Sequence, residues 1–200
     1  MGFWGFGVLG FWGFEANAIL TGDALLAYAF EIVARDTEPT NLAGPCVLAI
    51  ARAAGPSALV GGQFDDLAAG AQPGTLESLQ AIHRRKTGAM LTVSLELGGR
   101  VAGATPQQLD ALNTLGQSLG MVFQITDDLL DSTATAEQVG KRTRKDADKL
   151  KLTYPGLMGL EASRDEARRL TDLACEAAGQ FGERGKTLEL IARFVLERNQ

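Results

Sequence analysis

The residues best suited to chemistry in this sequence are three aspartates close together, Asp127, Asp128 and Asp131. Side chains three and four residues apart on a helix share one face, so these carboxylates lie together and repel one another. We expect them at the C-terminal end of the longest predicted helix, where the helix dipole also disfavours negative charge. Mg²⁺ would offset this repulsion, because it binds one or two carboxylates and completes its shell with water or phosphate oxygens. A solvated acidic helix end accounts for the three residues equally well.

Lysines stand on both sides of this acidic cluster in the sequence. Lys86 precedes it, and four others follow it: Lys141, Lys145, Lys149 and Lys151. A metal on one side and ammonium groups on the other is an arrangement suited to a diphosphate. Each lysine taken alone is also explained as a solvated surface charge. The combination therefore favours a diphosphate site without excluding an ordinary charged surface.

Apolar residues recur every three to four positions along most of the chain, which predicts helices. Thr105-Pro106 supplies a cap and a first helical position for the longest helix, which carries the acidic cluster. No run alternates with a period of two for more than a few residues, and no linker divides the chain. The sequence thus predicts an all-α protein. Its helices are expected over residues 15–35, 42–54, 57–69, 75–98 and 105–131, with two more after residue 155.

Composition limits the class of protein further. The 200 residues are 46% hydrophobic and 22% charged, which suffices for one domain with a buried core. The net charge of −5 is the wrong sign for nucleic-acid binding, so we expect no nucleic acid as partner. Cys46 and Cys175 have no metal-ligand spacing, which favours two buried thiols in a reducing cytoplasm.

Residues 1–14 differ from the rest of the chain. They carry no charge, are rich in glycine, and contain the sequence Gly-Phe-Trp-Gly-Phe twice. The apolar run ends at Glu15, which is short of the roughly 20 residues of a transmembrane helix, and its glycines disfavour a helix. We expect a disordered or partner-packed arm. Membrane association through this arm is the less favoured alternative.

A set of short motifs lies along the chain from about Glu15 to the C-terminus. Its segments are Gly22-Asp23, Gly61-Gly62-Gln63, Asp66-Leu67, Ile82-His83, Lys86-Thr87-Gly88, Phe123-Gln124, Asp127-Asp128 with Asp131, Gly140-Lys141, Lys145-Asp146 and Lys151 to Pro155. A lone DDxxD motif is weak evidence, but an ordered set of motifs at matching spacing is specific. In these segments the sequence resembles the isoprenyl (polyprenyl) diphosphate synthases, of the farnesyl and geranylgeranyl type. The chain is accordingly divided into the arm, 1–14, and a polyprenyl synthase-like helical domain, 15–200.

This resemblance implies an isoprenoid synthase-type helical bundle, typically dimeric, that condenses isopentenyl diphosphate with an allylic prenyl diphosphate. Asp127, Asp128 and Asp131 match the second aspartate-rich motif, which binds Mg²⁺ on the allylic diphosphate. Lys86 matches a lysine that contacts this diphosphate. Asp127, Asp128 and Lys86 are therefore the expected catalytic residues. Further positions that bind diphosphate in the family match Thr87, Gln124, Lys141 and Lys151.

The sequence also departs from the family pattern. The family's first aspartate-rich motif and its basic N-terminal patch have no counterpart here, so we expect an N-terminally truncated bundle. Asp65-Asp66 lacks a third carboxylate and is assigned to the Gly-Gly-Gln segment rather than to a second metal site. His83 is expected in an exposed or capping role. Three interpretations follow: an active prenyltransferase, a non-catalytic subunit that pairs with an intact synthase, and a truncated product with little activity. The expected assembly is a homodimer or a heterodimer with a full-length synthase.

Overall fold

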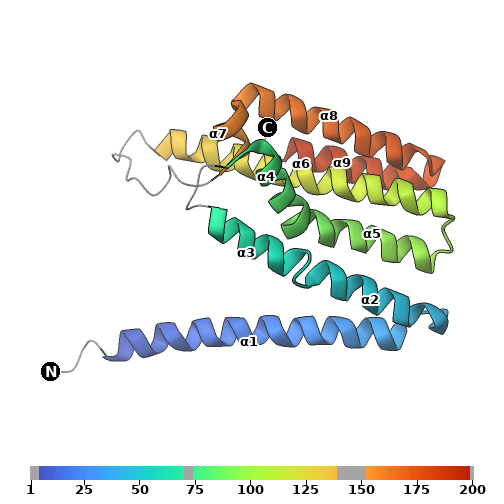
Figure 1. Cartoon of the computed structure of the whole chain (residues 1–200), viewed down its shortest axis with the longest axis horizontal. Helices are drawn as coiled ribbons and strands as arrows, with labels where there is room; N and C mark the ends of the chain where they lie inside the picture. The colour runs from blue at the N-terminus through green and yellow to red at the C-terminus, as the bar shows by residue number, and fades with distance from the viewer. Residues whose placement is uncertain (1–4, 70–73, 139–151, 199–200) are drawn as a thin grey trace. The chain divides into compact units, whose positions relative to one another are not determined.

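The computed structural model describes residues 5–69, 74–138 and 152–198. All regular secondary structure within these ranges is helical, which confirms the prediction of an all-α protein (Figure 1). The chain forms two compact units, Met1–Leu48 and Ala49–Gln200. All the described candidate site residues lie in the second unit.

The first unit consists mainly of α1 (Gly5–Asp36), with η1 (Thr40–Leu42) and the start of α2 (Ala43–Ala54) after it. The prediction that residues before Glu15 are a poor helix is wrong for residues 5–14, which are helical. Extending an existing helix adds a hydrogen bond per residue without a new nucleation cost, so glycines at one end do not stop it. The assignment of residues 1–14 to a separate arm stays a prediction.

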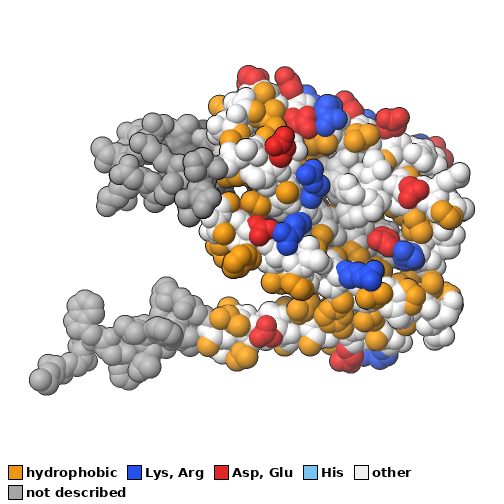
Figure 2. Space-filling view, viewed as in Figure 1, with side chains coloured by type: hydrophobic (Ala, Val, Ile, Leu, Met, Phe, Trp, Pro, Cys, Tyr) orange, Lys and Arg blue, Asp and Glu red, His pale blue; other side chains and the backbone are white. Residues whose placement is uncertain are grey.

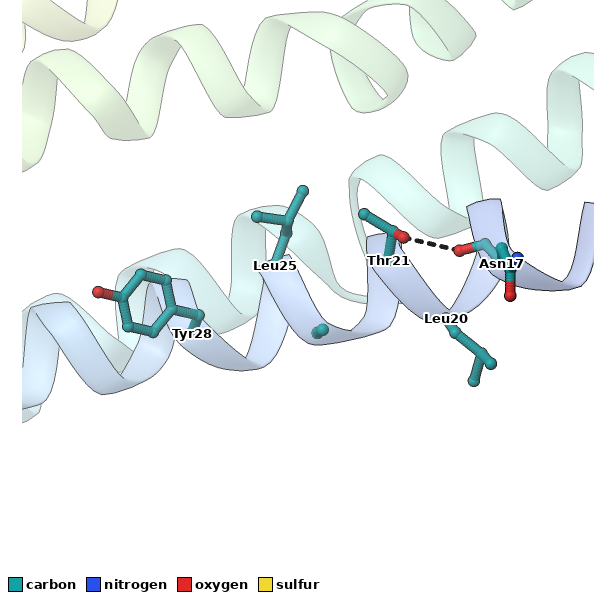
Figure 3. A pocket seen from close by; sticks show the side chains of 6 residues that line it. Asn17, Leu20, Thr21, Leu25 and Tyr28 are labelled. Carbon is teal, nitrogen blue, oxygen red and sulfur yellow. Dashed lines mark hydrogen bonds between the residues drawn. The ribbon is translucent and has the colours of Figure 1, made fainter. Parts of the chain in front are cut away.

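The described side chains of α1 are largely apolar and exposed, as Figure 2 shows along this helix. Two segments, Ala16–Asp36 and Thr40–Ala69, are long and apolar enough to cross a membrane, a test that core helices of soluble proteins also pass. A shallow groove runs along α1 between Asn17 and Tyr28, where the Thr21 hydroxyl donates to the Asn17 carbonyl at 2.7 Å (Figure 3). This bond is internal to the helix, so the groove is a feature of its surface.

The second unit is a bundle around one long central helix, α6 (Pro106–Gln138). It packs against α5 (Ala89–Val101), α8 (Leu160–Gly179) and α9 (Lys186–Glu197), as Figure 1 shows. Short elements complete the unit: α3 (Leu59–Ala69), α4 (Leu76–His83), the π-helical turn η2 (Arg84–Gly88), α7 (Tyr154–Met158) and η4 (Gly182–Gly185).

Two apolar clusters hold this bundle together, and α6 contributes to both. Alanines of α8 and α9 pack closely against α6, because small side chains let helices approach one another. The first cluster contains Leu79, Met121, Val122, Ile125, Leu129, Tyr154, Ala167 and Leu170. The second contains Leu115, Leu119, Ala174, Ala177, Ala178 and Ala192.

The predicted start of the longest helix is confirmed, and its predicted end is wrong. Thr105 accepts from the Gln108 N–H at 3.3 Å while the Gln108 side chain accepts from the Thr105 N–H at 2.9 Å, so Pro106 is the first helical residue. The helix continues to Gln138 and does not end near the aspartates. Because the helix dipole acts mainly on the last turn, Asp127 to Asp131 lie outside its reach.

Candidate functional site

A pocket of about 270 Å³ in the second unit collects most of the predicted site residues. Asp127, Asp128, Asp131 and Gln124 from α6 line it together with Lys86 from η2. The structure therefore brings the acidic cluster and Lys86 to one pocket, and their roles there stay predictions. Asp66 of α3, His83 of α4 and Leu152 complete the lining.

The helical period of α6 explains why its polar side chains reach the pocket together. Asp127 and Asp128 follow Gln124 by three and four residues, and Asp131 follows them by four and three, so all four share a face. The opposite face carries the apolar residues of the first core cluster, which fixes the rotation of the helix. Burial of one face thus directs four polar side chains into the same space.

Asp128 is the most buried of these carboxylates, with 5% of its surface exposed. Its Oδ2 accepts a hydrogen bond from the backbone N–H of Tyr154 at 3.0 Å. This bond connects α6 to the first residue of α7, 26 positions further along the chain. Asp128 therefore has a structural function as well as a place in the pocket.

Lys86, which lines the pocket, lies in a π-helical turn at Arg84–Gly88. Such turns shift the following side chains around the helix and are frequent at functional sites. Neighbouring helices approach η2 at two glycines. A Cβ on Gly62 would lie 2.5 Å from the backbone nitrogen of Lys86, and one on Gly120 would lie 2.5 Å from the Gly88 Cα. Glycine is needed at both positions for these close contacts.

Two consecutive aspartates of α3 bind two consecutive cations of η2. The Lys86 Nζ lies 2.6 Å from Asp66 Oδ2, within the pocket. Arg85 instead pairs with Asp65 and donates to the carbonyls of Pro56 and Ser57, each at 3.1 Å. Asp66 therefore holds the ammonium group inside the pocket. Arg85 instead joins η2 both to α3, through Asp65, and to the turn before α3.

His83 is buried, with 4% of its surface exposed, so the expected exposed or capping role is wrong. Its ring stacks on Tyr154, with 5.8 Å between centroids and 30° between planes. Apolar residues of the first cluster surround Tyr154, and this environment favours burial of the imidazole face. Sequence reasoning missed His83 and Asp66 as pocket residues. The signal for Asp66 was Gly62, whose close approach to η2 brings α3 alongside Lys86.

The remaining predicted diphosphate-binding residues have different outcomes. Thr87 is half-buried in η2 and does not line the pocket. Lys141 and Lys151 lie outside the described residues, so their predicted roles stay predictions.

Tyr154, which stacks on the pocket residue His83, provides a test of how the stability of the protein responds to pH. Burial raises the pKa of its phenol to about 12. The folded protein therefore keeps the phenol proton above pH 10, where the unfolded chain loses it, and stability falls between about pH 10 and 12. We expect Tyr154→Phe to remove about 2 kcal/mol of the stability loss between pH 8 and 11.5 in urea unfolding. The exposed Tyr28→Phe serves as control, and equal curves for both variants would contradict the expectation.

The oxygen donors in this pocket suit a hard cation. Among the residues that the structure describes, no three His, Cys, Asp or Glu side chains are placed together as a ready metal site. Mg²⁺ does not require one, since it binds through one or two carboxylates and keeps several waters or phosphate oxygens. Asp127 and Asp131, one helical turn apart and both solvent-accessible, fit that requirement.

Comparison with known proteins places the chain among relatives of known fold. It is 40% identical over 188 residues to a geranylgeranyl diphosphate synthase of Cyanophora paradoxa, covering 92% of this chain and 63% of that protein. It is 37% identical over 194 residues to the farnesyl diphosphate synthase of Escherichia coli, covering 93% and 64%. The chain thus spans less than two thirds of the length of these relatives.

Solved structures agree with this placement. A putative farnesyl-diphosphate synthase from Marinomonas sp. superposes with a TM-score of 0.79 at 30% identity, covering 92% of this chain and 63% of that one. A geranyltransferase from Helicobacter pylori, solved with magnesium and isoprenyl diphosphate, gives 0.73 at 26% identity, covering 92% and 60%. The sequence model of the Polyprenyl synthetase family matches residues 11–190. The chain therefore belongs to the Polyprenyl synthetase family.

Proposed function

We propose that this chain supplies the second-aspartate part of a prenyltransferase site that condenses isopentenyl diphosphate with an allylic prenyl diphosphate. The observation that carries the proposal is the pocket, which joins the α6 carboxylates to Lys86 and Gln124. The names of the relatives, geranylgeranyl and farnesyl diphosphate synthase, support the same substrate class. In this reaction the allylic C–O bond breaks, a C–C bond forms to the second substrate, and a proton is lost.

The residues of the pocket have distinct tasks in this proposal. Asp127 and Asp131 would hold Mg²⁺, which when bound supplies positive charge to the departing diphosphate. Lys86 donates to the diphosphate oxygens, and Asp66 keeps its ammonium group within the pocket when no substrate is present. The Gln124 amide donates from the same face of α6. Donors fixed in place before the bond breaks stabilise the charge that develops as it does.

A second candidate function is that of a non-catalytic subunit that binds an intact synthase. It is favoured by an exposed apolar face on α3, where Val60, Phe64 and Leu67 expose 57%, 71% and 76% of their surface. These residues lie at three- and four-residue intervals on one side of the helix. Contiguous apolar surface of this kind is typical of a protein–protein interface.

One assay separates the two functions. The purified chain is incubated with Mg²⁺, isopentenyl diphosphate and a radiolabelled allylic diphosphate, alone and mixed with a full-length synthase. Elongated product from the chain alone supports the enzyme. Product only in the mixture, with a length distribution different from that of the synthase alone, supports the subunit. No product alone and no change in the mixture contradicts both.

A further inference from the structure

Arg198, at the end of α9, binds α6 beside its acidic residues. Its Nη2 donates to the Phe123 carbonyl at 3.1 Å, to the Thr126 hydroxyl at 3.2 Å and to Asp127 Oδ1. The guanidinium also lies over the Phe123 ring, 4.0 Å from its centroid. These groups belong to little more than one turn of α6, more than 70 residues earlier in the chain. Arg198 therefore has a single, well-defined binding place on α6.

One of the groups that Arg198 binds there, Asp127, is also one of the two carboxylates proposed to hold the cation. Asp127 exposes 46% of its side chain and Arg198 24%. Asp127 has a second carboxylate, Asp131, one turn further along the same helix, and like charges at that spacing repel. A guanidinium at Asp127 relieves this repulsion. In the described part of the pocket, the other cation, Lys86, is already paired with Asp66.

We propose that Arg198 is the counter-ion of Asp127 in the cation-free protein, and that a divalent cation competes with it for this carboxylate. The proposal rests on the proposed function, in which Asp127 binds the cation. A guanidinium on Oδ1 occupies a ligand oxygen and repels a second positive charge nearby. Arg198 therefore weakens cation binding, and by reciprocal linkage the bound cation weakens the attachment of Arg198.

The linkage predicts a consequence for the end of α9. Arg198 is the C-terminal cap residue of this helix, and its N–H donates to the Phe194 carbonyl at 3.0 Å. When the contact with Asp127 is lost, the last turn of α9 retains fewer contacts with α6. Cation binding at Asp127 is thus expected to speed up local opening of the backbone at Phe194–Arg198. Arg198 is a positioning residue in this scheme, since it acts through Asp127.

The test uses Mn²⁺ as an electron-paramagnetic probe titrated into the full chain, with free Mn²⁺ read from its spectrum. Arg198→Gln is expected to bind Mn²⁺ about 3–10-fold more tightly than the unaltered protein, because one repelling charge is removed. Arg193→Gln is the matched control, since it removes the same charge from an exposed position on the same helix. Its affinity is expected to change by less than about twofold.

A second measurement needs no variant, so it holds even if Arg198→Gln fails to fold. Hydrogen exchange at Phe194–Arg198 of the unaltered protein is expected to speed up on addition of Mg²⁺, while exchange at Leu188–Ala192 stays constant. Equal or weaker Mn²⁺ binding by Arg198→Gln, or unchanged exchange in a protein that does bind Mn²⁺, overturns the competition and leaves the proposed function standing. Absence of Mn²⁺ binding by the unaltered protein overturns the proposed function itself.

Discussion

Asp127→Asn is expected to lower prenyl transfer by about 10²–10³-fold, measured as kcat/KM in the assay that shows activity. The amide has nearly the shape of the carboxylate and can still accept from Arg198, so the end of α9 stays attached to α6. It lacks the negative charge that, in the proposed reaction, would hold a hard cation near the leaving diphosphate. The loss therefore measures charge stabilisation of the transition state rather than damage to the bundle.

Asp110→Asn is the matched control for this effect. Asp110 lies exposed near the start of the same helix, remote in sequence from the pocket residues. Its activity is expected to remain within about twofold of the unaltered protein, because surface substitutions away from a site have small effects. Activity of Asp127→Asn equal to that of Asp110→Asn would contradict a role for Asp127 in the reaction. A direct Mn²⁺ titration of both variants reports the same difference without turnover.

Much of the bundle could be predicted because its signals are local. Thr105-Pro106 sets the start of α6 through side-chain bonds to the next turn, and the apolar period fixes which face is buried. That face also decides which polar residues point away from the core. The convergence of Asp127, Asp128 and Asp131 on one surface therefore followed from spacing alone. The lysines on either side of the cluster already included Lys86, and the family resemblance assigned it to the diphosphate.

The features that were missed depend on contacts between distant segments. His83 looked like a surface residue beside two arginines, but its burial is decided by Tyr154, on an element whose position the local sequence does not determine. The pairing of Arg198 with Asp127 crosses 71 positions and leaves no periodic pattern. The widened turn at η2 likewise lies where α3 and α6 approach it closely, at the glycines Gly62 and Gly120.

The helix over residues 5–14 was missed for a different reason. Propensity compares residues one at a time, and glycine scores poorly by that measure. Growth from an established helix costs far less than nucleation, and α1 supplies that helix in residues 15–36. The C-terminal end of the longest helix was also predicted too early in the sequence. The apolar period ends at Leu129 and Leu130, which places the aspartates at the predicted helix end, yet α6 continues for seven residues beyond Asp131.

Gly120→Ala is expected to destabilise the protein by about 2–3 kcal/mol in urea unfolding, although alanine is the better helix former. The added Cβ would lie 2.5 Å from the Gly88 Cα, and the atoms in the way belong to backbone that cannot rotate aside. Relief requires η2 to move away from α6, and η2 carries Lys86. The substitution should therefore weaken diphosphate binding as well as stability.

Gly98→Ala shows what the same change does without the close contact. Gly98 is exposed within α5, and a Cβ there meets no atom within 4 Å. We expect this variant to be more stable by about 0.5–1 kcal/mol, because alanine loses less backbone entropy on folding. The two substitutions thus change the free energy of unfolding in opposite directions if the contact between α6 and η2 is as tight as the structure shows. Stabilisation by Gly120→Ala would mean that η2 is not held against α6, and Lys86 would then lack a fixed place opposite the aspartates.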